Sequence, residues 1–401
     1  MVLSFLMAVS VLGQTPLLVM SGQSLSQGLA TASATSTTQP YSNTMPSVVA
    51  QETTGTGIHS FETYLANMSA WPTTALLETS IENPRSGAAN YYRSTTGINL
   101  HVVSGSKGGT AYSGLKKGTS PWDNMSASIE AANARSSGGA ACVAFYVEHG
   151  EGDHNAGTSR AAYTANLVEW QYDVAAKCRT AARGGDPPLF IAQFSSWTAT
   201  GLTGHATTSL IPLAVYDAAR ANSSTIKIVG PHYYLTHAVD GVHMTSTESR
   251  RMGAMAGKAI AAGTSWQPLW PRLSSPVSRA TNVITVYLYT PVPPLVVDTT
   301  NVTGVSASTR GFEYTDDSSP PAISSVDCSA ACSGNICSCA ITLASTPTGA
   351  NKKLRYAYTG VDGNHGGPTS GPRGNIRDSD TATWQGANLY NWLVHFEEAV
   401  P

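Results

Sequence analysis

Charged residues are scarce in this sequence. Asp, Glu, Lys and Arg make up 12% of the 401 residues, and the formal net charge is -2. A chain without a basic patch or a run of like charges lacks the electrostatic footprint of nucleic-acid binding or of attachment to an anionic membrane, so we expect neither partner. No apolar run reaches the about 20 residues that a transmembrane helix needs, so no membrane span is predicted.

Lysine is also sparse, whereas Gly, Ser, Thr and Ala are abundant. This composition is typical of a secreted or periplasmic protein, or of a virion component. Residues 2–13 form an apolar run of signal-peptide length without the positive n-region of a signal peptide, and residues 17–20 directly after them look like a core strand. We interpret the start of the chain as the first turns of the fold or as the remnant of a leader.

Cysteines are few, and four of the six lie close together in a C-x3-C-x4-C-x-C pattern. These four residues are Cys328, Cys332, Cys337 and Cys339. The pattern predicts two short disulfides, which implies an oxidising compartment. A zinc site is the alternative, although zinc motifs usually carry two C-x2-4-C pairs. Cys142 lies in an apolar strand and Cys178 on a helix, and both are predicted to be core residues.

Apolar strands alternate with helical patterns through the first two thirds of the chain. Strands are predicted at 17–20, 98–103, 141–147, 188–193 and 226–229, and helices at 159–183, 209–221 and 245–263. This alternation predicts a parallel sheet covered by helices on both faces. Residues 30–56 show no sustained period and are predicted to form a surface loop, followed by a short helix at 59–68.

The pattern changes near Pro271. Residues 283–289 alternate apolar and polar side chains, which is typical of a half-buried antiparallel strand, and several short strands follow. We therefore expect an α/β domain over 1–271 and an all-β sandwich or jelly-roll domain over 272–375. Residues 376–401 carry apolar side chains at helical spacing, which predicts a helix that docks back on the first domain or on the interface. These side chains are Leu389, Trp392, Leu393 and Phe396.

The first predicted strand runs directly into small and polar residues, with Ser24 at the turn. In an open α/β sheet, ligands bind beyond the carboxyl ends of the strands. The backbone N–H groups at the start of the following helix favour developing negative charge. Ser24 is therefore a candidate nucleophile, and an ordinary capping serine is the alternative. A G-x-S-x-G nucleophile elbow is excluded because position 26 is Ser.

Three further polar segments are predicted at the same sheet edge. Gly108 follows the second strand, residues 149–153 (His-Gly-Glu-Gly-Asp) follow the third, and Asp240 and His243 precede the last helix. Serine needs a base to take its proton, and a carboxylate fixes the tautomer of the histidine base. The N–H groups of Ser24 and Gly108, with a side chain from the third strand end, are candidate donors to an oxyanion.

Three further histidines could form a metal site together with His149. These are His154, His232 and His237. Their spacing matches no catalytic zinc pattern, so we expect no metal and no cofactor. His365 is predicted to be a surface residue.

The four segments resemble, in order and spacing, the four blocks of SGNH (GDSL-type) hydrolases, in particular the sialate O-acetylesterases and related carbohydrate acetylesterases. The resemblance covers about residues 16–262 and implies a flavodoxin-like three-layer sheet. It implies that Ser24 is the nucleophile, His243 the general base and Asp240 its orienting acid. It also implies Ser24, Gly108 and His149 as oxyanion donors and Gln23, Glu151 and Asp153 as supporting residues.

Two positions depart from the pattern of these enzymes. His149 stands where relatives often carry Gln, so it is either an oxyanion donor through its ring N–H or a substrate contact. Leu25 replaces the Asn that commonly follows the nucleophile, which removes a hydrogen bond that stabilises the loop.

The resemblance predicts a serine esterase that removes O-acetyl groups from carbohydrates through an acyl-enzyme, with an acetylated sugar as its partner. Two alternatives remain open at this point. One is a glycan-binding or adhesion protein, such as a phage tail or cell-surface component, in which the hydrolase domain is vestigial. The other is a broad short-chain aryl or lipid esterase of the same fold.

Overall fold

The computed structural model describes residues 13–28, 33–46, 73–78, 81–182 and 185–401. The helix predicted at 59–68 and the apolar run at 2–12 lie outside the described residues. The N-terminal part is a seven-stranded sheet in the order β3-β2-β4-β1-β5-β6-β7. Its strands are β1 (Thr15–Gly22), β2 (Thr44–Pro46), β3 (Thr73–Ala75), β4 (His101–Ser106), β5 (Ala140–Glu148), β6 (Leu189–Gln193) and β7 (Ile226–Pro231).

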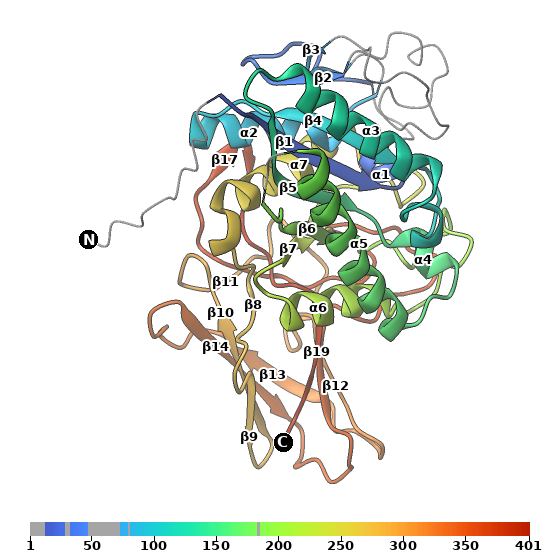
Figure 1. The fold of residues 1–401 in the computed structure, drawn as a ribbon. Coiled ribbons are helices and arrows are strands. Elements are labelled where there is room, and N and C mark those ends of the chain that lie inside the picture. Colours follow the sequence, from blue (N-terminus) through green and yellow to red (C-terminus); the bar gives the residue numbers. More distant parts are fainter. Residues whose placement is uncertain (1–12, 29–32, 47–72, 79–80, 183–184) are drawn as a thin grey trace.

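Helices cover both faces of this sheet (Figure 1). They are α1 (Ser24–Gln27), α2 (Pro84–Thr96), α3 (Ser120–Arg135), α4 (Glu151–Asn155), α5 (Arg160–Ala181), α6 (Ile211–Ala221) and α7 (Ser246–Ala262). Helices α3, α5 and α6 lie on one face, and α2 and α7 pack together on the other. Two short 3-10 helices, at Tyr112–Gly114 and Gly263–Ser265, complete the helical elements of the part of the chain that the structure describes. None of the helices in the described part of the chain is long and apolar enough to cross a membrane.

The five predicted strands are all present and parallel, in the order β4-β1-β5-β6-β7. This is the 2-1-3-4-5 order of flavodoxin-like folds, so the predicted fold class is confirmed. The apolar residues 17–20 of the central strand are fully buried, as a parallel strand covered on both faces requires.

Three differences from the prediction concern this part. Strand β2 lies within the predicted loop 30–56, and the antiparallel β3 pairs with it at the sheet edge. Helices α2 and α3 were not predicted; their sequences are rich in small and polar residues such as Ser, Asn and Ala. Cys142 and Cys178 are buried as predicted, but they form a disulfide between β5 and α5 instead of packing as free thiols.

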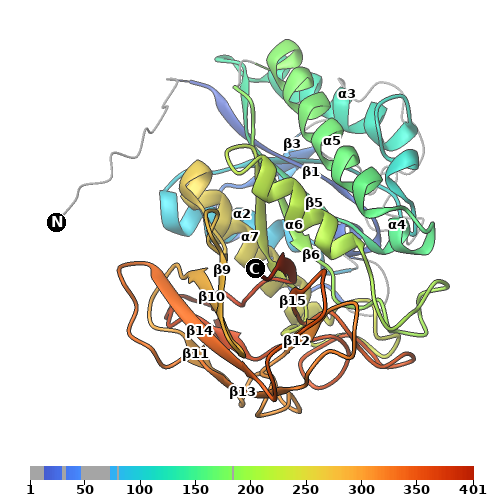
Figure 2. The ribbon, with the colours of Figure 1, turned by 90° about the horizontal axis from the view of Figure 1, so that it is seen from below.

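The C-terminal part consists of antiparallel strands (Figure 2). One sheet holds β8 (Trp270–Pro271), β9 (Val277–Ala280), β10 (Val283–Tyr289), β13 (Ile323–Asp327) and β14 (Ile336–Leu343). A second holds β12 (Phe312–Thr315), β15 (Lys353–Tyr356) and β19 (Phe396–Ala399). Two pairs are β11 (Val296–Val297) with β16 (Ile376–Arg377) and β17 (Thr383–Trp384) with β18 (Ala387–Asn388). The predicted short disulfides are confirmed as Cys328–Cys339 and Cys332–Cys337.

The end of the chain is extended and not helical, so the helix predicted from the apolar spacing after residue 388 is wrong. The backbone of this segment bonds to neighbours on several sides. The Val394 N–H donates to the Leu269 carbonyl at 3.1 Å, and the Tyr233 hydroxyl donates to the Leu393 carbonyl at 2.7 Å. Because these partners satisfy its peptide groups, the segment needs no internal helical hydrogen bonds. The boundaries at 271 and 375 stay predictions.

Candidate active site

Strand register brings the predicted site segments to one sheet edge. Gly22, the last residue of β1, lies opposite Ser106 at the end of β4 and opposite Glu148 at the end of β5. The turns after these three strands therefore meet. Gly22 has a φ of 141°, and a Cβ placed on it would lie 2.1 Å from the Glu148 carbonyl oxygen. Glycine is required there for the strands to end this close together.

Ser24, His243 and Asp240 form a continuous relay of hydrogen bonds. The Oγ atom of Ser24 lies 2.8 Å from Nε2 of His243, and Nδ1 of His243 lies 2.6 Å from Oδ2 of Asp240. Because the Asp240 carboxylate can only accept, Nδ1 carries the proton, which leaves Nε2 to accept the Ser24 hydroxyl proton. The three residues thus have the geometry of a nucleophile, a base and an orienting acid.

Asp240 is held ionised by its own loop. Its Oδ1 atom accepts the backbone N–H groups of Val242 and His243, both at 3.0 Å. Partial burial acts to raise the pKa of Asp240, but these N–H groups and the His243 ring outweigh it and hold the pKa well below its usual range. Asp240 therefore stays a carboxylate at any pH at which the protein would work.

The relay opens into a cavity of about 280 Å³. Eleven residues line it: Gln23, Ser24, Gly108, Gly109, Glu151, Gly152, Asn155, Gly201, Leu202, Val242 and His243. The predicted Ser24, Gly108, Gln23, Glu151 and His243 are thus brought together. Asn155, Gly201 and Leu202 were missed. Gly201 and Leu202 follow β6 in the chain. Because β6 ends at this same sheet edge, its position could have indicated that the loop after it lines the site.

Two of the predicted supporting residues brace the turns around the cavity. The Gln23 side-chain carbonyl accepts the Gly152 N–H at 2.8 Å. The Asp153 carboxylate accepts the Tyr112 N–H and the Thr158 hydroxyl, both at 2.7 Å. Gln23 ties the turn after β1 to α4, and Asp153 ties α4 to the segment after β4. These bonds hold the turn of Ser24 and the segment after β4 in place.

His149 does not reach the cavity, in contrast to its predicted role as an oxyanion donor or substrate contact. Its Nε2 atom lies 2.9 Å from the Thr110 carbonyl and its Nδ1 atom 2.8 Å from the Tyr163 hydroxyl. Both ring nitrogens are thus engaged, and the side chain is buried. Burial lowers the pKa of His149, while Asp153 and the Thr110 carbonyl act against it. His149 is better interpreted as a brace for the Gly108 turn, and we do not carry the oxyanion role forward.

A buried group of titratable side chains lies next to the turn after β1 that carries Ser24. The Tyr146 hydroxyl donates to Glu148, and Nε2 of His232 lies 3.2 Å from the other oxygen of the Glu148 carboxylate. Glu151 lies nearby, and neither of its oxygens has a hydrogen-bond partner among the described residues. Burial raises the pKa of Glu151 to about 7, with Glu148 adding to the shift and His232 and His243 opposing it. Glu148 and Tyr146 were not singled out in the sequence.

A C-terminal segment, residues 359–371, contacts the loop that carries Asp240 and His243, and we name this segment the strap. Its Gly366 N–H donates to the Gly241 carbonyl, between Asp240 and His243, at 3.0 Å. Its Gly363 N–H donates to the Thr198 carbonyl at 2.8 Å. The strap therefore touches both loops that close the cavity after β6 and β7. His365 is exposed, as predicted.

Among the described residues, no group of three or more His, Cys, Asp or Glu side chains could hold a metal ion. His154, His232 and His237 thus do not assemble with His149 into a metal site.

Comparison with known proteins identifies structural but not sequence relatives. No family model and no curated protein sequence matches the chain. XAC1771, a carbohydrate acetylesterase from Xanthomonas citri, matches 95% of this chain and 80% of its own with a TM-score of 0.62 and 13% identity. A protein from Arabidopsis thaliana covers 62% of this chain and 98% of its own with a TM-score of 0.44 and 14% identity. The match to NanS covers 62% of this chain and 97% of NanS, with a TM-score of 0.42 and 10% identity.

The match to the acetylesterase extends through both the α/β part and the C-terminal β part of the chain. At this low identity the likeness concerns the fold. This chain has the fold of that acetylesterase, and its four sequence blocks resemble those of the SGNH hydrolases, which agrees with that fold.

Proposed function

We propose that this protein is a serine esterase that removes O-acetyl groups from carbohydrates through an acyl-enzyme intermediate. The observation that carries the proposal is the unbroken relay from Ser24 through His243 to Asp240, which opens into a cavity. A buried serine next to an arbitrary histidine would not also show a carboxylate on the far ring nitrogen. The fold shared with XAC1771, which is described as a carbohydrate acetylesterase, supports the same reaction class.

The first half of the reaction acylates the serine. His243 Nε2 takes the hydroxyl proton as Ser24 Oγ attacks the acetyl carbon, and the electrons of the carbonyl π bond move to its oxygen. The backbone N–H groups of Ser24 and Gly108, both at the cavity, are the proposed donors to this oxyanion. The intermediate collapses, the sugar oxygen leaves with the proton from His243, and the acetyl group stays on Ser24.

The second half releases acetate. His243 takes a proton from water, whose oxygen attacks the acyl carbon, and the bond to Ser24 Oγ breaks as His243 returns the proton to it. Asp240 stays ionised throughout and stabilises the imidazolium that forms in both halves. Apart from the ester and one water molecule, these steps use only side chains and backbone groups of the described residues.

A short acyl group fits the cavity better than a long one. Its volume of about 280 Å³ lies just below the range of about 300–1,000 Å³ that is typical of small-molecule sites. This supports an acetylesterase over the broad aryl or lipid esterase. The complete relay of Ser24, His243 and Asp240 argues against a vestigial hydrolase in an adhesion protein, because glycan binding alone does not require these three side chains to be aligned.

Three disulfides support the proposal that the protein works in an oxidising compartment, as a secreted or periplasmic protein would. Its proposed partner is an acetylated carbohydrate.

The proposal is tested by acetate release from an aryl acetate and from acetylated xylan, pectin and sialic acid, with wild type and Ser24→Ala. We expect wild-type turnover on aryl acetate and on at least one carbohydrate, and loss of both in the variant. Turnover by Ser24→Ala equal to that of wild type would overturn the assignment. A series of longer aryl esters separates the alternatives, because an acetylesterase loses activity steeply beyond the acetyl ester.

A further inference from the structure

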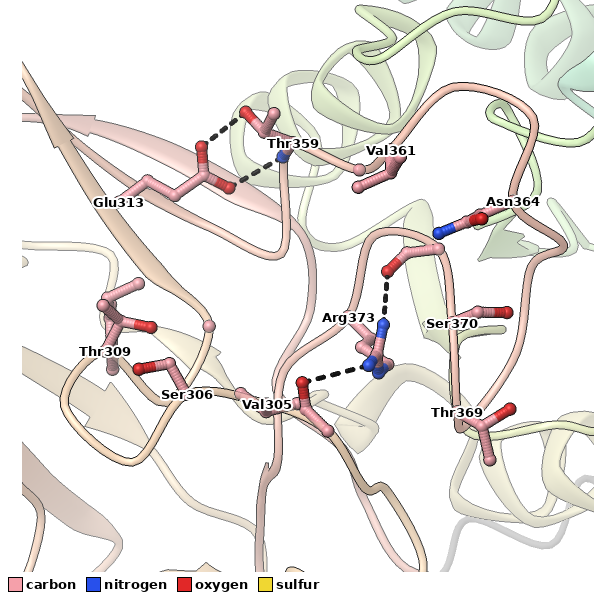
Figure 3. A pocket seen from close by; sticks show the side chains of 15 residues that line it. Val305, Ser306, Thr309, Glu313, Thr359, Val361, Asn364, Thr369, Ser370 and Arg373 are labelled. Carbon is pink, nitrogen blue, oxygen red and sulfur yellow. Dashed lines mark hydrogen bonds between the residues drawn. The ribbon is translucent and has the colours of Figure 1, made fainter.

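A second and larger pocket lies in the C-terminal part of the molecule (Figure 3). Its volume is about 620 Å³, more than twice that of the catalytic cavity. One wall carries Ser306 and Thr309, and the facing wall carries Asn364, Thr369 and Ser370, with Arg373 between them. The second wall belongs to the strap, the same segment that holds the catalytic loop.

Both walls are fixed before any ligand binds. The Arg373 guanidinium donates to the carbonyls of Thr303, Gly304 and Gly371 at 2.9, 3.1 and 2.9 Å, which ties one wall to the other. The Glu313 carboxylate accepts the Thr359 N–H and hydroxyl at 2.7 and 2.6 Å. A pocket that is already ordered loses less conformational entropy when it binds a ligand.

The groups left for a ligand are mostly neutral and polar. The Asn364 amide and the Thr309 and Thr369 hydroxyls have no side-chain hydrogen bond to the described residues, whereas Glu313 and Arg373 are engaged with the backbone. The apolar side chains at the pocket are few, and Phe312 among them is buried. Hydroxyl and amide groups of this kind match a ligand rich in hydroxyls better than an alkyl chain or a phosphate.

The pocket adjoins the catalytic loop along the chain. Asn364 lines the pocket, and Gly366, two residues further, donates to the Gly241 carbonyl between Asp240 and His243. Two residues span at most about 7 Å, so the pocket edge lies within about that distance of the Gly366 contact. The catalytic cavity is too small for several sugar units, so the rest of a polymeric substrate must lie outside it.

We propose that this pocket is a subsite for the unacetylated part of an oligosaccharide whose acetylated unit lies at Ser24. The proposal rests on the function proposed above and deepens it: the substrate is a chain of sugar units and not an acetylated monosaccharide. The strap then has two roles, since it lines the subsite with Asn364, Thr369 and Ser370 and holds the loop of Asp240 and His243 through Gly366.

The test uses tetrasaccharides and the matching monosaccharides from xylan, mannan and galacturonan, each mono-O-acetylated. Two variants alter the pocket: Asn364→Ala/Thr369→Ala removes the free polar groups, and Thr369→Trp fills the space. Thr299→Trp is the matched control, because Thr299 is exposed in the same part of the chain and outside the pocket. Thermal unfolding shows whether each variant is folded.

We expect at least one tetrasaccharide to have a kcat/KM at least about tenfold above that of its monosaccharide, which two or three net hydrogen bonds provide. Both pocket variants should remove this advantage, mainly through KM, and Thr299→Trp should keep it. The proposal is overturned if no tetrasaccharide exceeds its monosaccharide, or if the advantage persists in folded Thr369→Trp.

A binding measurement separates this result from a failure of the proposed function. Calorimetric titration of the unacetylated tetrasaccharides into Ser24→Ala reports on the subsite without catalysis. Binding that Thr369→Trp abolishes and Thr299→Trp retains supports the subsite even if no ester is hydrolysed. Equal binding in both Trp variants contradicts it even if the esterase activity is present.

Discussion

The candidate active site and the C-terminal pocket differ in how exposed their polar side chains are. At the edge of the α/β sheet, Glu148, His149, Glu151 and His232 are all buried, and Ser24 is only 8% exposed. In the C-terminal pocket, Asn364 and Thr369 are exposed. Buried, fixed groups in a region with little water act strongly on charge that develops in a reaction. Exposed neutral groups recognise a ligand at little cost in desolvation. The first arrangement suits the chemistry proposed above and the second suits the proposed recognition of a ligand.

Removal of the proposed base, His243, should have the largest effect. This effect should concern catalysis at the candidate active site and not the C-terminal pocket. We predict that His243→Ala lowers kcat on an aryl acetate by about 10²- to 10⁴-fold, because Ser24 then has no group to accept its proton. His205→Ala is the control for the loss of an imidazole outside the relay, since its exposed ring pairs with Asp362 of the strap and not with Ser24 or Asp240. Stopped-flow or steady-state assays measure both. Equal activity of the two variants would contradict the assignment of His243.

The disulfides of the two regions should differ in their contribution to stability. Cys142–Cys178 joins residues separated by 36 positions, and Cys332–Cys337 residues separated by 5. Loop-closure entropy predicts that replacing the first pair by Ala lowers the free energy of unfolding by about 4 kcal/mol and replacing the second by about 2 kcal/mol. Urea unfolding of the two double variants, each the control for the other, measures the difference. A larger loss from the second pair would contradict this prediction.

The smallest predicted effect concerns Glu151 and depends on pH. The pKa of Glu151 is about 7 in the folded protein, whereas the reference value for a glutamate side chain is 4.5. The folded protein therefore binds this proton more tightly than the unfolded chain does. As pH rises from about 4.5 to 7, the unfolded chain ionises first and the folded protein loses stability. We predict that Glu151→Gln is more stable than wild type by about 1–3 kcal/mol at pH 8 and that this gain disappears at pH 4.

Urea unfolding across this pH range measures the effect, with Glu169→Gln as the control. Glu169 is half-exposed, with 49% of its side chain accessible. A gain that does not change with pH, or an equal gain in Glu169→Gln, would show that the charge of buried Glu151 is not its cause.

Local pattern and chain order were enough to predict the frame of the α/β part and the position of its candidate site residues. The parallel strands, Ser24 at the end of the first, and the Asp240 and His243 pair could be inferred because each carries a signal in its own neighbourhood. Helices α2 and α3 were missed, because small and polar residues dominate their sequences and their burial depends on packing that the sequence does not show. The C-terminal helix was wrong for the related reason that Leu389, Trp392, Leu393 and Phe396 pack equally well in an extended chain.

In the candidate site, too, features with a local sequence signal could be predicted and features that depend on distant contacts could not. His149 looked like a donor because it follows a strand at the correct edge, yet the orientation of its ring is set by Thr110 and Tyr163, which are distant in sequence. The strap contacts the loop of Asp240 and His243, although it lies more than a hundred residues further along the chain. Its sequence contains no motif that would predict this contact. Contacts of this kind depend on the tertiary structure and cannot be inferred from the spacing of residues.

The central claim is that Ser24 attacks an acetyl ester with His243 as its base. Rapid acid quench of the protein with an aryl acetate, followed by peptide mass spectrometry, tests this claim most directly. We predict one acetyl group on Ser24 in wild type and none at this position in His243→Ala or Ser24→Ala. An acetyl group on another residue with equal turnover, or turnover in Ser24→Ala, would contradict the account.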